Sequence, residues 1–511
     1  MKKRWLHVLL FRRFIVVLLL LLQAYVLIEI VTSRSHASAM ANVALTVVSF
    51  LAVLHIISEK EKGGFKLAWV FLILLFPVFG GLFYLLFCYQ TDTKRFSRLA
   101  ERALSDDDLA LTWPKDARDE AIEALTPYRS QVRYLQDFAG FPVYDHSETE
   151  YLTPGEQKFE RLVEELHKAE RYIFLEYFIV QEGVMWNAIL EILKEKAKQG
   201  VKVRLMYDDI GCFFLLPEDY PRQLGEYGIE CVVFNAFKPF LTVKQNNRDH
   251  RKIAVIDGKV AFTGGINLAD EYINAIDKHG HWKDASVMVK GKAAWSFTVM
   301  FLRMWSLAAR RPEDVRPYYP WKDAPCETPS DGFVQPYGDS PMDKENVGEH
   351  VYLHILNSAR DYVYINTPYL IIDDSLVSAL TLAAKSGVDV RIVTPHRWDK
   401  WAVHMTTRSY YRELIRSGVK IYEYTKGFIH AKTFVADDRI ATVGTTNLDY
   451  RSLYLHFECG AVLYGGKAVM QVKEDFLKTL EICQRIREED CDSNVIKRLI
   501  QEIFRLFAPL M

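Results

Sequence analysis

Residues 250–267 read HRKIAVIDGKVAFTGGIN and residues 430–447 read HAKTFVADDRIATVGTTN, so one spaced pattern occurs twice in the chain. In each stretch a histidine is followed by lysine at the third position, aspartate at the eighth, glycine at the fifteenth and asparagine at the eighteenth. With 14 histidines in the chain and the other residue types at average frequency, chance predicts about 0.003 copies of the first four positions. The duplication therefore indicates a repeated functional unit.

The spacing inside the first stretch predicts a β-hairpin that carries a histidine and a lysine on one face. Residues two apart on a strand point the same way, so on a strand the side chains of His250 and Lys252 would project together. Asp257 separates the apolar runs 253–256 and 260–263 and precedes a glycine, which predicts a turn between two strands. This aspartate is therefore expected to be a scaffold residue rather than a reacting group.

Glycine and asparagine after the second run predict an anion site. Gly264 and Gly265 would let backbone amides approach an anion, and the Asn267 amide would add a side-chain donor. The second stretch repeats these features at Gly444, Thr445 and Asn447. Two imidazoles, two ammonium groups and two amides would together suit a phosphodiester.

The chain of 511 residues is long enough for two catalytic-sized units and additional sequence. Three further segments recur in the same order before each histidine: residues 169–175 resemble 359–365, 200–205 resemble 387–392, and 228–230 resemble 418–420. Short strands rich in Val, Ile and Tyr alternate with helical stretches at 187–200 and 375–387, which predicts an α/β sandwich in each of two similar lobes. A shared interface between the lobes would bring the two histidines together.

Charge and cysteine content narrow the class of protein. The formal net charge of −1 argues against a nonspecific nucleic-acid binder, which would need a basic surface. The 7 cysteines form no Cys-x-x-Cys pair or metal-like cluster, so neither a disulfide framework nor a zinc site is predicted. We expect neither a metal nor a cofactor.

The N-terminal part has a different composition, with apolar runs at residues 14–31, 41–57 and 67–88. Each run approaches or exceeds the ~17–20 residues needed to cross a bilayer, which predicts two or three transmembrane helices. The third run has Trp69 and Tyr84 near its ends, and we expect a kink at Pro77. A secretory signal is the rival interpretation of the first run, because basic residues precede it and residues 37–39 resemble a cleavage site.

Charges around these runs leave two topologies open. Basic residues at positions 2–4 and 12–13 favour a cytoplasmic N-terminus, whereas those at 94, 95, 98 and 102 favour a cytoplasmic catalytic part. Three full crossings cannot satisfy both clusters. Either one run is re-entrant or interfacial, or the charge rule is broken in this chain.

The doubled His-x-Lys-x4-Asp motif resembles that of the phospholipase D superfamily, and within it the bacterial cardiolipin synthase type. Supporting segments are residues 152–159 (LTPGEQKF), 175–179 (LEYFI), 249–253 (DHRKI), 264–272 (GGINLADEY) and 447–458 (NLDYRSLYLHFE). The resemblance runs from about residue 67 to the C-terminus. Thr445 stands where the superfamily commonly has serine, and His456 stands where this type has asparagine.

The resemblance implies a two-step displacement at phosphorus. His250 would attack to form a phosphohistidine and His430 would act as general acid and base, although the residues themselves are compatible with either order. The other motif residues that the resemblance groups with the catalytic histidines are Lys252, Asp257, Lys432 and Asp437, with Asn267 and Asn447 binding the phosphate oxygens.

Two acidic residues outside the motif match the family's positions for orienting the histidines. A nucleophilic imidazole needs an acceptor at its far nitrogen, and Asp284 and Glu458 would supply one. The alternative is that these acids lie on strands and face solvent. Weaker candidates for the headgroup pocket, with ordinary strand packing as the alternative, are Glu176, Tyr369, Arg451 and Ser452.

By resemblance, the expected function is phosphatidyl transfer between two phosphatidylglycerol molecules, giving cardiolipin and glycerol, at the cytoplasmic face of the bacterial cell membrane. Alternatives with the same chemistry are a hydrolytic phospholipase D and a phosphatidylserine synthase. A phosphodiesterase acting on nucleic acid would require a basic channel, so no nucleic-acid partner is expected. The non-enzyme alternative is a lipid-binding membrane scaffold. The oligomeric state is left open.

The expected division of the chain is a membrane anchor at 1–90, a linker at 91–135, a first lobe at 136–330 and a second lobe at 331–511. At the C-terminus, apolar residues spaced three and four apart between positions 495 and 507 form one helical stripe. We expect this helix to dock on the lobes, with bilayer contact as the alternative.

Overall fold

The computed structural model describes residues 36–76, 80–88, 122–236, 246–322, 325–343, 345–492 and 494–510, together with Tyr25 and Ile28. The chain forms two compact units. The first contains residues 1–94, 237–245 and 506–510, and the second contains residues 95–236, 246–505 and 511.

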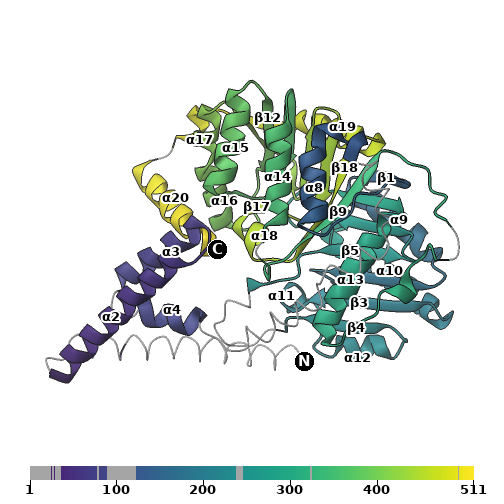
Figure 1. The fold of residues 1–511 in the computed structure, drawn as a ribbon, viewed down its shortest axis with the longest axis horizontal. Helices are drawn as coiled ribbons and strands as arrows, with labels where there is room; N and C mark the ends of the chain where they lie inside the picture. The colour runs from purple at the N-terminus through teal and green to yellow at the C-terminus, as the bar shows by residue number, and fades with distance from the viewer. Residues whose placement is uncertain are drawn as a thin grey trace. The chain divides into compact units, whose positions relative to one another are not determined.

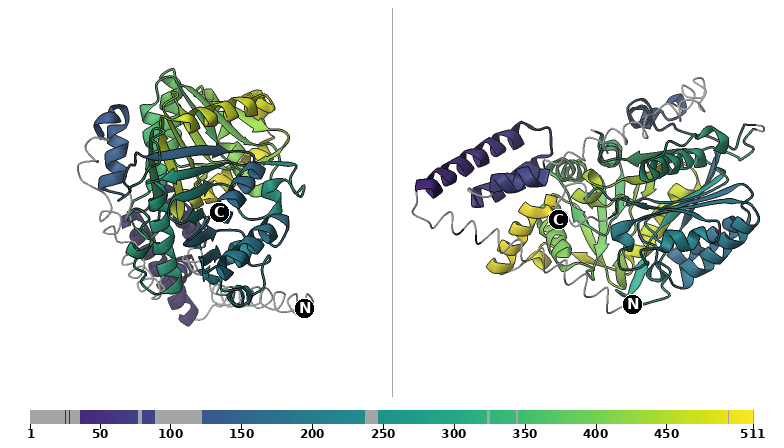
Figure 2. Two further views of the ribbon diagram at one scale, coloured as in Figure 1. Left: turned by 90° about the vertical axis from the view of Figure 1, so that its right-hand side faces the viewer. Right: turned by 90° about the horizontal axis from the view of Figure 1, so that it is seen from below.

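The two large β-sheets of the second unit repeat one topology (Figures 1 and 2). The first sheet has the strand order β1-β8-β6-β5-β2-β3-β4, and the second has the order β19-β13-β12-β10-β15-β16-β18-β9. Read from its β9 edge, the second sheet matches the first strand for strand, with β19 added at the far edge. The predicted duplication of an α/β lobe is therefore confirmed.

Strand bounds show the same correspondence. Those of the first sheet are β1 Ser147–Leu152, β2 Tyr172–Tyr177, β3 Lys202–Asp208, β4 Glu230–Phe234, β5 Lys252–Ile256, β6 Val260–Gly264 and β8 Ser286–Gly291. Those of the second are β9 Phe333–Asp339, β10 Tyr362–Asn366, β12 Asp389–Pro395, β13 Lys420–Tyr424, β15 Thr433–Ala436, β16 Ile440–Gly444, β18 Glu458–Tyr464 and β19 Cys483–Ile486. The repeated sequence segments thus begin equivalent strands in the two lobes.

One hydrophobic core joins the two lobes. It contains side chains from both sheets together with those of α13 (Ala294–Ala309) and α19 (Lys467–Leu480). Phe174 of the first sheet stacks on Phe301 of α13 with 4.7 Å between ring centres, and Tyr364 of the second stacks on Phe476 of α19 at 4.8 Å. Helices that pack along the sheets include α9 Gly155–His167, α10 Val184–Lys198, α14 Val347–Ser358 and α15 Asp374–Lys385. The shared core fixes the two sheets against each other.

The predicted hairpin forms in both lobes. Strand β5 pairs antiparallel with β6, and β15 pairs antiparallel with β16. Asp257 and Asp437, at the turns, both have a φ of 53°. Strand β5 begins at Lys252, so His250 lies in the segment before the strand rather than on it.

The motif aspartates hold backbone rather than substrate. Asp257 is buried, and its carboxylate accepts hydrogen bonds of 2.8 Å from three consecutive backbone amides, those of residues 170–172. Asp437 accepts the same three bonds, at 2.8–3.0 Å, from the amides of residues 360–362. Each aspartate therefore ties its hairpin turn to the start of the central strand, as the spacing predicted, and neither belongs among the reacting groups.

The first unit contains α2 (His36–Ser58), α3 (Gly63–Leu75) and α4 (Gly80–Cys88). The expectation of one kinked helix over residues 67–88 is wrong, because these residues belong to two helices that pack on each other. In a straight helix, Trp69 and Tyr84 would lie ~22 Å apart, whereas their ring centres are 5.3 Å apart in an edge-to-face contact. In the described part of the chain, no helix is both long and apolar enough to span a membrane.

Three expectations fall wholly or largely on residues outside the described ones. The first apolar run, at 14–31, is outside them except for Tyr25 and Ile28, and Pro77 is also outside. The same holds for residues 91–121 of the expected linker.

We expect Asp257→Ala to lower the free energy of unfolding by about 3 kcal/mol, because three backbone amides lose a charged acceptor. Chemical denaturation of the detergent-solubilised chain, followed by tryptophan fluorescence, measures the change. Asp314→Ala is the matched control, since Asp314 is exposed and makes only local bonds with Arg316. Equal midpoints for the two variants would contradict the scaffold role.

Candidate active site

The segment that carries His250 is bonded to the second lobe. The His250 backbone amide donates to the Phe457 carbonyl at 3.0 Å, and the Phe457 amide donates to the Arg248 carbonyl at 2.9 Å. The next residue, Glu458, begins β18 and is fully buried. Its two carboxylate oxygens lie 2.9 and 3.0 Å from Nδ1 of His250. The imidazole of the first lobe is thus held by a carboxylate of the second.

The same arrangement occurs around His430 with the lobes exchanged. Strand β14 (Gly427–Ile429) of the second lobe pairs with β7 (His281–Lys283) of the first. The His430 amide donates to the Lys283 carbonyl at 2.7 Å, and Asp284 follows directly. Its Oδ2 lies 2.7 Å from Nδ1 of His430. Each lobe therefore supplies the carboxylate that orients the other lobe's histidine.

These bonds determine the state of both imidazoles. A carboxylate only accepts, so Nδ1 of each ring carries the proton and Nε2 keeps a lone pair. Burial lowers the pKa of His250 to about 3 and that of His430 to about 4, against the opposing effect of the carboxylates. Both rings are therefore neutral at neutral pH, and either Nε2 could act as nucleophile or base.

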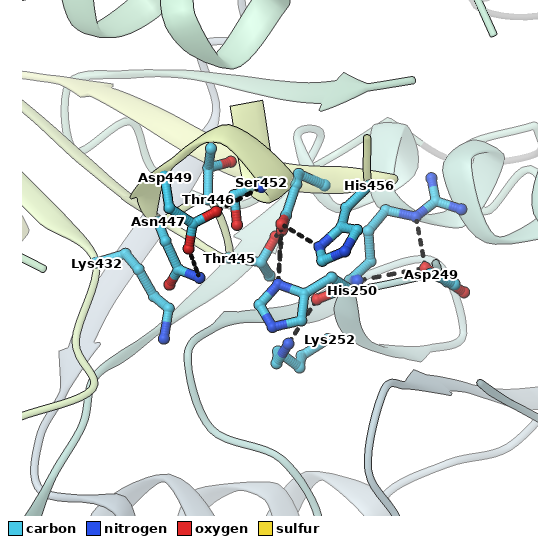
Figure 3. A network of polar contacts seen from close by, with 12 residues as sticks. Asp249, His250, Lys252, Lys432, Thr445, Thr446, Asn447, Asp449, Ser452 and His456 are labelled. Carbon is cyan, nitrogen blue, oxygen red and sulfur yellow. Dashed lines mark hydrogen bonds and ion pairs between the residues drawn. The ribbon is translucent and has the colours of Figure 1, made fainter. Parts of the chain in front are cut away.

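Each motif histidine has a lysine ammonium group beside it, and Figure 3 shows Lys252 with His250 and also labels Lys432. Nζ of Lys252 donates to the His250 carbonyl, and Nζ of Lys432 donates to the His430 carbonyl. Burial lowers the pKa of Lys252 to about 8 and that of Lys432 to about 7, and the charge of Lys252 adds to the shift at Lys432. An incoming anion would be attracted by both groups and would stabilise their charged form.

The motif asparagines are less free than expected. Asn267 donates from Nδ2 to the Tyr272 hydroxyl at 2.7 Å and accepts from the Ile179 amide at 3.0 Å. Asn447 donates to Asp449 at 3.1 Å, and its buried Oδ1 makes no hydrogen bond to any described residue. Each Nδ2 keeps one further hydrogen, so each amide could still donate once to a phosphate oxygen.

The paired glycines have a different purpose from the one predicted. The Gly265 amide is already bonded to the Ala285 carbonyl at 2.9 Å, so it does not point at an anion. A Cβ at Gly265 would lie 2.0 Å from Oδ1 of Asp284, and one at Gly264 would lie 2.4 Å from the Ala285 carbonyl. Glycine is needed here because Asp284 must approach His430 across this turn.

The weaker pocket candidates fall in different places. Glu176 is fully buried and paired with Arg251 at 2.7 Å, which favours the alternative of packing within the sheet. Tyr369 donates to Asp399 at 2.5 Å, with its ring 6.5 Å from Phe428.

Ser452 and Arg451 lie on the short helix α18 (Tyr450–Tyr454). The Ser452 amide donates to Asp449, the partner of Asn447 (Figure 3). Burial lowers the pKa of Arg451. Ser452 is therefore linked to the motif asparagine of the second lobe through Asp449.

Sequence reasoning gave no role to one position in each lobe, two residues before the orienting acid. In the second lobe it is His456, whose ring centre is 5.5 Å from that of His250 and whose Nδ1 is 3.7 Å from Glu458. In the first it is Trp282, with its ring centre 5.3 Å from that of His430. Aligning the two lobes on Asp284 and Glu458 would have identified the pair.

Thr445 also binds the Glu458 carboxylate. Its hydroxyl donates to Oε2 of Glu458, so the threonine at the usual serine position keeps the donor. Among described residues, His250, His456 and Glu458 form the one acidic or metal-ligand type cluster whose ligand atoms lie within 4.8 Å of one another. Glu458 is already bonded to His250 and Thr445. The role that these contacts support for the cluster is to orient the His250 imidazole.

Comparison with known proteins gives consistent matches over most of the chain. Residues 162–305 and 352–480 match the family described as "Cardiolipin synthase, PLD-like domain", and residues 47–87 match the phospholipase D-nuclease N-terminal family. The chain is 36% identical over 478 residues to a cardiolipin synthase of Alkalihalophilus pseudofirmus, covering 91% of this chain and 94% of that one. It is 34% identical over 476 residues to a cardiolipin synthase of Halalkalibacterium halodurans, covering 92% and 93%.

Two further comparisons extend this result. An uncharacterized protein of Streptococcus mutans is 42% identical over 461 residues, covering 90% of this chain and 99% of that one. The crystal structure of phosphatidylserine synthase from Haemophilus influenzae Rd KW20 superposes with a TM-score of 0.54 at 14% identity, covering 74% of this chain and 97% of that one. The latter shows a shared fold.

We expect Gly265→Ala to reduce turnover roughly 100-fold or more while the protein stays folded, because the new Cβ displaces Asp284 and hence His430. Steady-state kinetics and near-UV circular dichroism measure the two effects. Gly225→Ala is the control, since a Cβ there meets nothing within 4 Å. Wild-type turnover in Gly265→Ala would contradict the proposed contact.

We also expect the fall of kcat/KM with rising pH to become steeper near the pKa of about 7 of Lys432. Its folded-state pKa is lowered, so the ammonium is present below that pH and lost above it. Lys432→Arg keeps its charge, so the fall should move toward the pKa of about 8 of Lys252. The exposed Lys426→Arg is the control, and an unmoved profile in Lys432→Arg would exclude Lys432 as its source.

Proposed function

Because the chain belongs to the family of phospholipase D-like cardiolipin synthases, we propose that it transfers a phosphatidyl group from one phosphatidylglycerol to another, giving cardiolipin and glycerol. The observation that carries this proposal is the pair of neutral imidazoles, each oriented by a buried carboxylate and each beside a lysine. Such a site can form and break a bond to phosphorus twice without a cofactor.

In the first step, Nε2 of His250 attacks the phosphorus of phosphatidylglycerol. The bond to the glycerol oxygen breaks, and His430 donates a proton from Nε2 to that oxygen, releasing glycerol. His430 must be protonated for this step, although burial lowers its pKa to about 4 in the empty site. The anionic phosphodiester raises that pKa when it binds, so substrate binding and proton uptake are coupled.

In the second step, a hydroxyl of another phosphatidylglycerol attacks the phosphohistidine. Neutral His430 accepts the hydroxyl proton, the N–P bond to His250 breaks, and cardiolipin leaves. Lys252 and Lys432 would bind the nonbridging oxygens in both steps and neutralise the charge that develops on them. Asn267 and Asn447 would each contribute the remaining amide hydrogen. The order of the two histidines follows the family resemblance.

We assign the N-terminal part, residues 1–90, to a multi-pass anchor in the bacterial cell membrane, and place the active site at the cytoplasmic face. Support comes from the three apolar runs and from the N-terminal family match over residues 47–87. An anchor suits the reaction, because both lipid substrates then diffuse in the bilayer that holds the enzyme. Residues 136–330 and 331–511 are assigned as the two lobes.

We expect the detergent-solubilised full chain, given phosphatidylglycerol as sole lipid and no divalent metal, to produce cardiolipin and glycerol. Mass spectrometry of the lipid extract identifies the products, and His250→Ala is the inactive control. Phosphatidic acid in place of cardiolipin would show that water is the acceptor. Product only after addition of CDP-diacylglycerol and serine would instead show a phosphatidylserine synthase.

A further inference from the structure

The C-terminal helix α20 (Val495–Phe507) is attached to the second lobe in an unusual orientation. Its half-buried side is mixed in character and includes Arg505, which donates to Glu413 at 2.7 Å and lies 4.3 Å from the centre of the Tyr410 ring. Phe504, at one edge of the apolar stripe, packs edge-on against Trp401 at 5.6 Å. Docking of the apolar stripe on the second lobe is therefore partial and involves one edge of the stripe.

The centre of the apolar stripe faces outward. Val495 is 83% exposed, Ile496 71%, Leu499 60% and Ile503 45%. Their spacing puts them within one arc of the helix. Water contact over four large aliphatic side chains is unfavourable, and contiguous apolar surface of this kind marks an interaction site.

Residues around this arc have the composition of a membrane interface. Lys497 and Arg498 flank the stripe and are exposed. Trp401, which Phe504 contacts, is 49% exposed, and Trp398, three residues earlier in the chain, is 53% exposed. Aliphatic residues bordered by tryptophan and basic groups are typical of helices that lie in the headgroup region of an anionic bilayer.

This surface is connected to the candidate active site by a short series of contacts. Trp398 and Trp401 flank Asp399, which accepts a hydrogen bond from the Tyr369 hydroxyl. The Tyr369 ring lies 6.5 Å from that of Phe428, and the Phe428 ring lies 6.1 Å from that of His430. A lipid surface at α20 would therefore lie on the side of the second lobe that leads to the general acid.

We propose that α20 lies in the surface of an anionic phospholipid bilayer, with the arc formed by Val495, Ile496, Leu499 and Ile503 inserted among the acyl chains. This inference rests on the proposed function for the lipid, since phosphatidylglycerol is anionic and would attract Lys497 and Arg498. Residues 506–510, which include the last two residues of α20, belong to the same compact unit as the apolar helices α2–α4. Within that unit, Phe507 packs on Phe71 at 5.7 Å.

The test compares Leu499→Gln/Ile503→Gln with Glu502→Gln, which changes one exposed residue on the polar side of the same helix. Both are made in the full chain. Turnover is measured on phosphatidylglycerol in nanodiscs, and on monomeric short-chain phosphatidylglycerol with the protein in a lipid-free amphipathic polymer. We expect the double variant to lose roughly tenfold on the bilayer substrate and to keep its rate on the monomeric substrate. Glu502→Gln should keep both rates.

Two results would overturn the proposal. Unchanged bilayer turnover in the double variant would show that the arc is covered by other parts of this chain or has no role. Equal losses on both substrates would show that α20 only supports the second lobe.

If wild type forms no cardiolipin, the proposed function fails, and hydrogen–deuterium exchange of residues 494–507 then decides this inference alone. Protection by phosphatidylglycerol nanodiscs in wild type and Glu502→Gln, but not in the double variant, would support it. Equal exchange in all three proteins would refute it.

Discussion

The site depends on one constraint: each lobe provides the carboxylate that orients the histidine of the other lobe. His250 of the first lobe is held by Glu458 of the second, and His430 of the second is held by Asp284 of the first. Neither lobe alone contains an oriented imidazole. The continuous core between the sheets, and the backbone bonds at Phe457 and Lys283, hold each pair within hydrogen-bond distance. The duplication of the fold is thus required by the chemistry.

Burial then determines which side chains of the site are charged. Two carboxylates and two ammonium groups balance, and both imidazoles remain neutral because burial lowers their pKa. A bound phosphodiester adds one negative charge to this balanced site. The added charge favours protonation of one imidazole, so the substrate generates the general acid that it needs. Water would compete with the alcohol acceptor, and the apolar rings around the histidines, such as Phe178 and Trp282, limit its access.

Local sequence patterns were sufficient for the hairpins, the duplicated lobes and the motif residues, because each depends on neighbours a few positions apart. Interactions over long separations were harder to predict. His250 and Glu458 are 208 residues apart, and only the family resemblance pointed to their pairing. Gly265 looked like an anion-binding glycine, but the approach of Asp284 from another strand explains it. The packing of Trp69 on Tyr84, and the outward face of α20, likewise follow from tertiary contacts that periodicity does not encode.

The most direct test of the crossed carboxylates is a burst experiment with a phosphatidyl ester of p-nitrophenol, whose leaving group needs no proton. Glu458→Gln should slow the nitrophenol burst roughly 10³-fold, by analogy with loss of a histidine-orienting carboxylate, because it disorients His250 in the other lobe. Asp284→Asn should keep a stoichiometric burst and lose only later turnover, since it disables His430. A burst lost in Asp284→Asn and kept in Glu458→Gln, or equal bursts in both, would contradict the account.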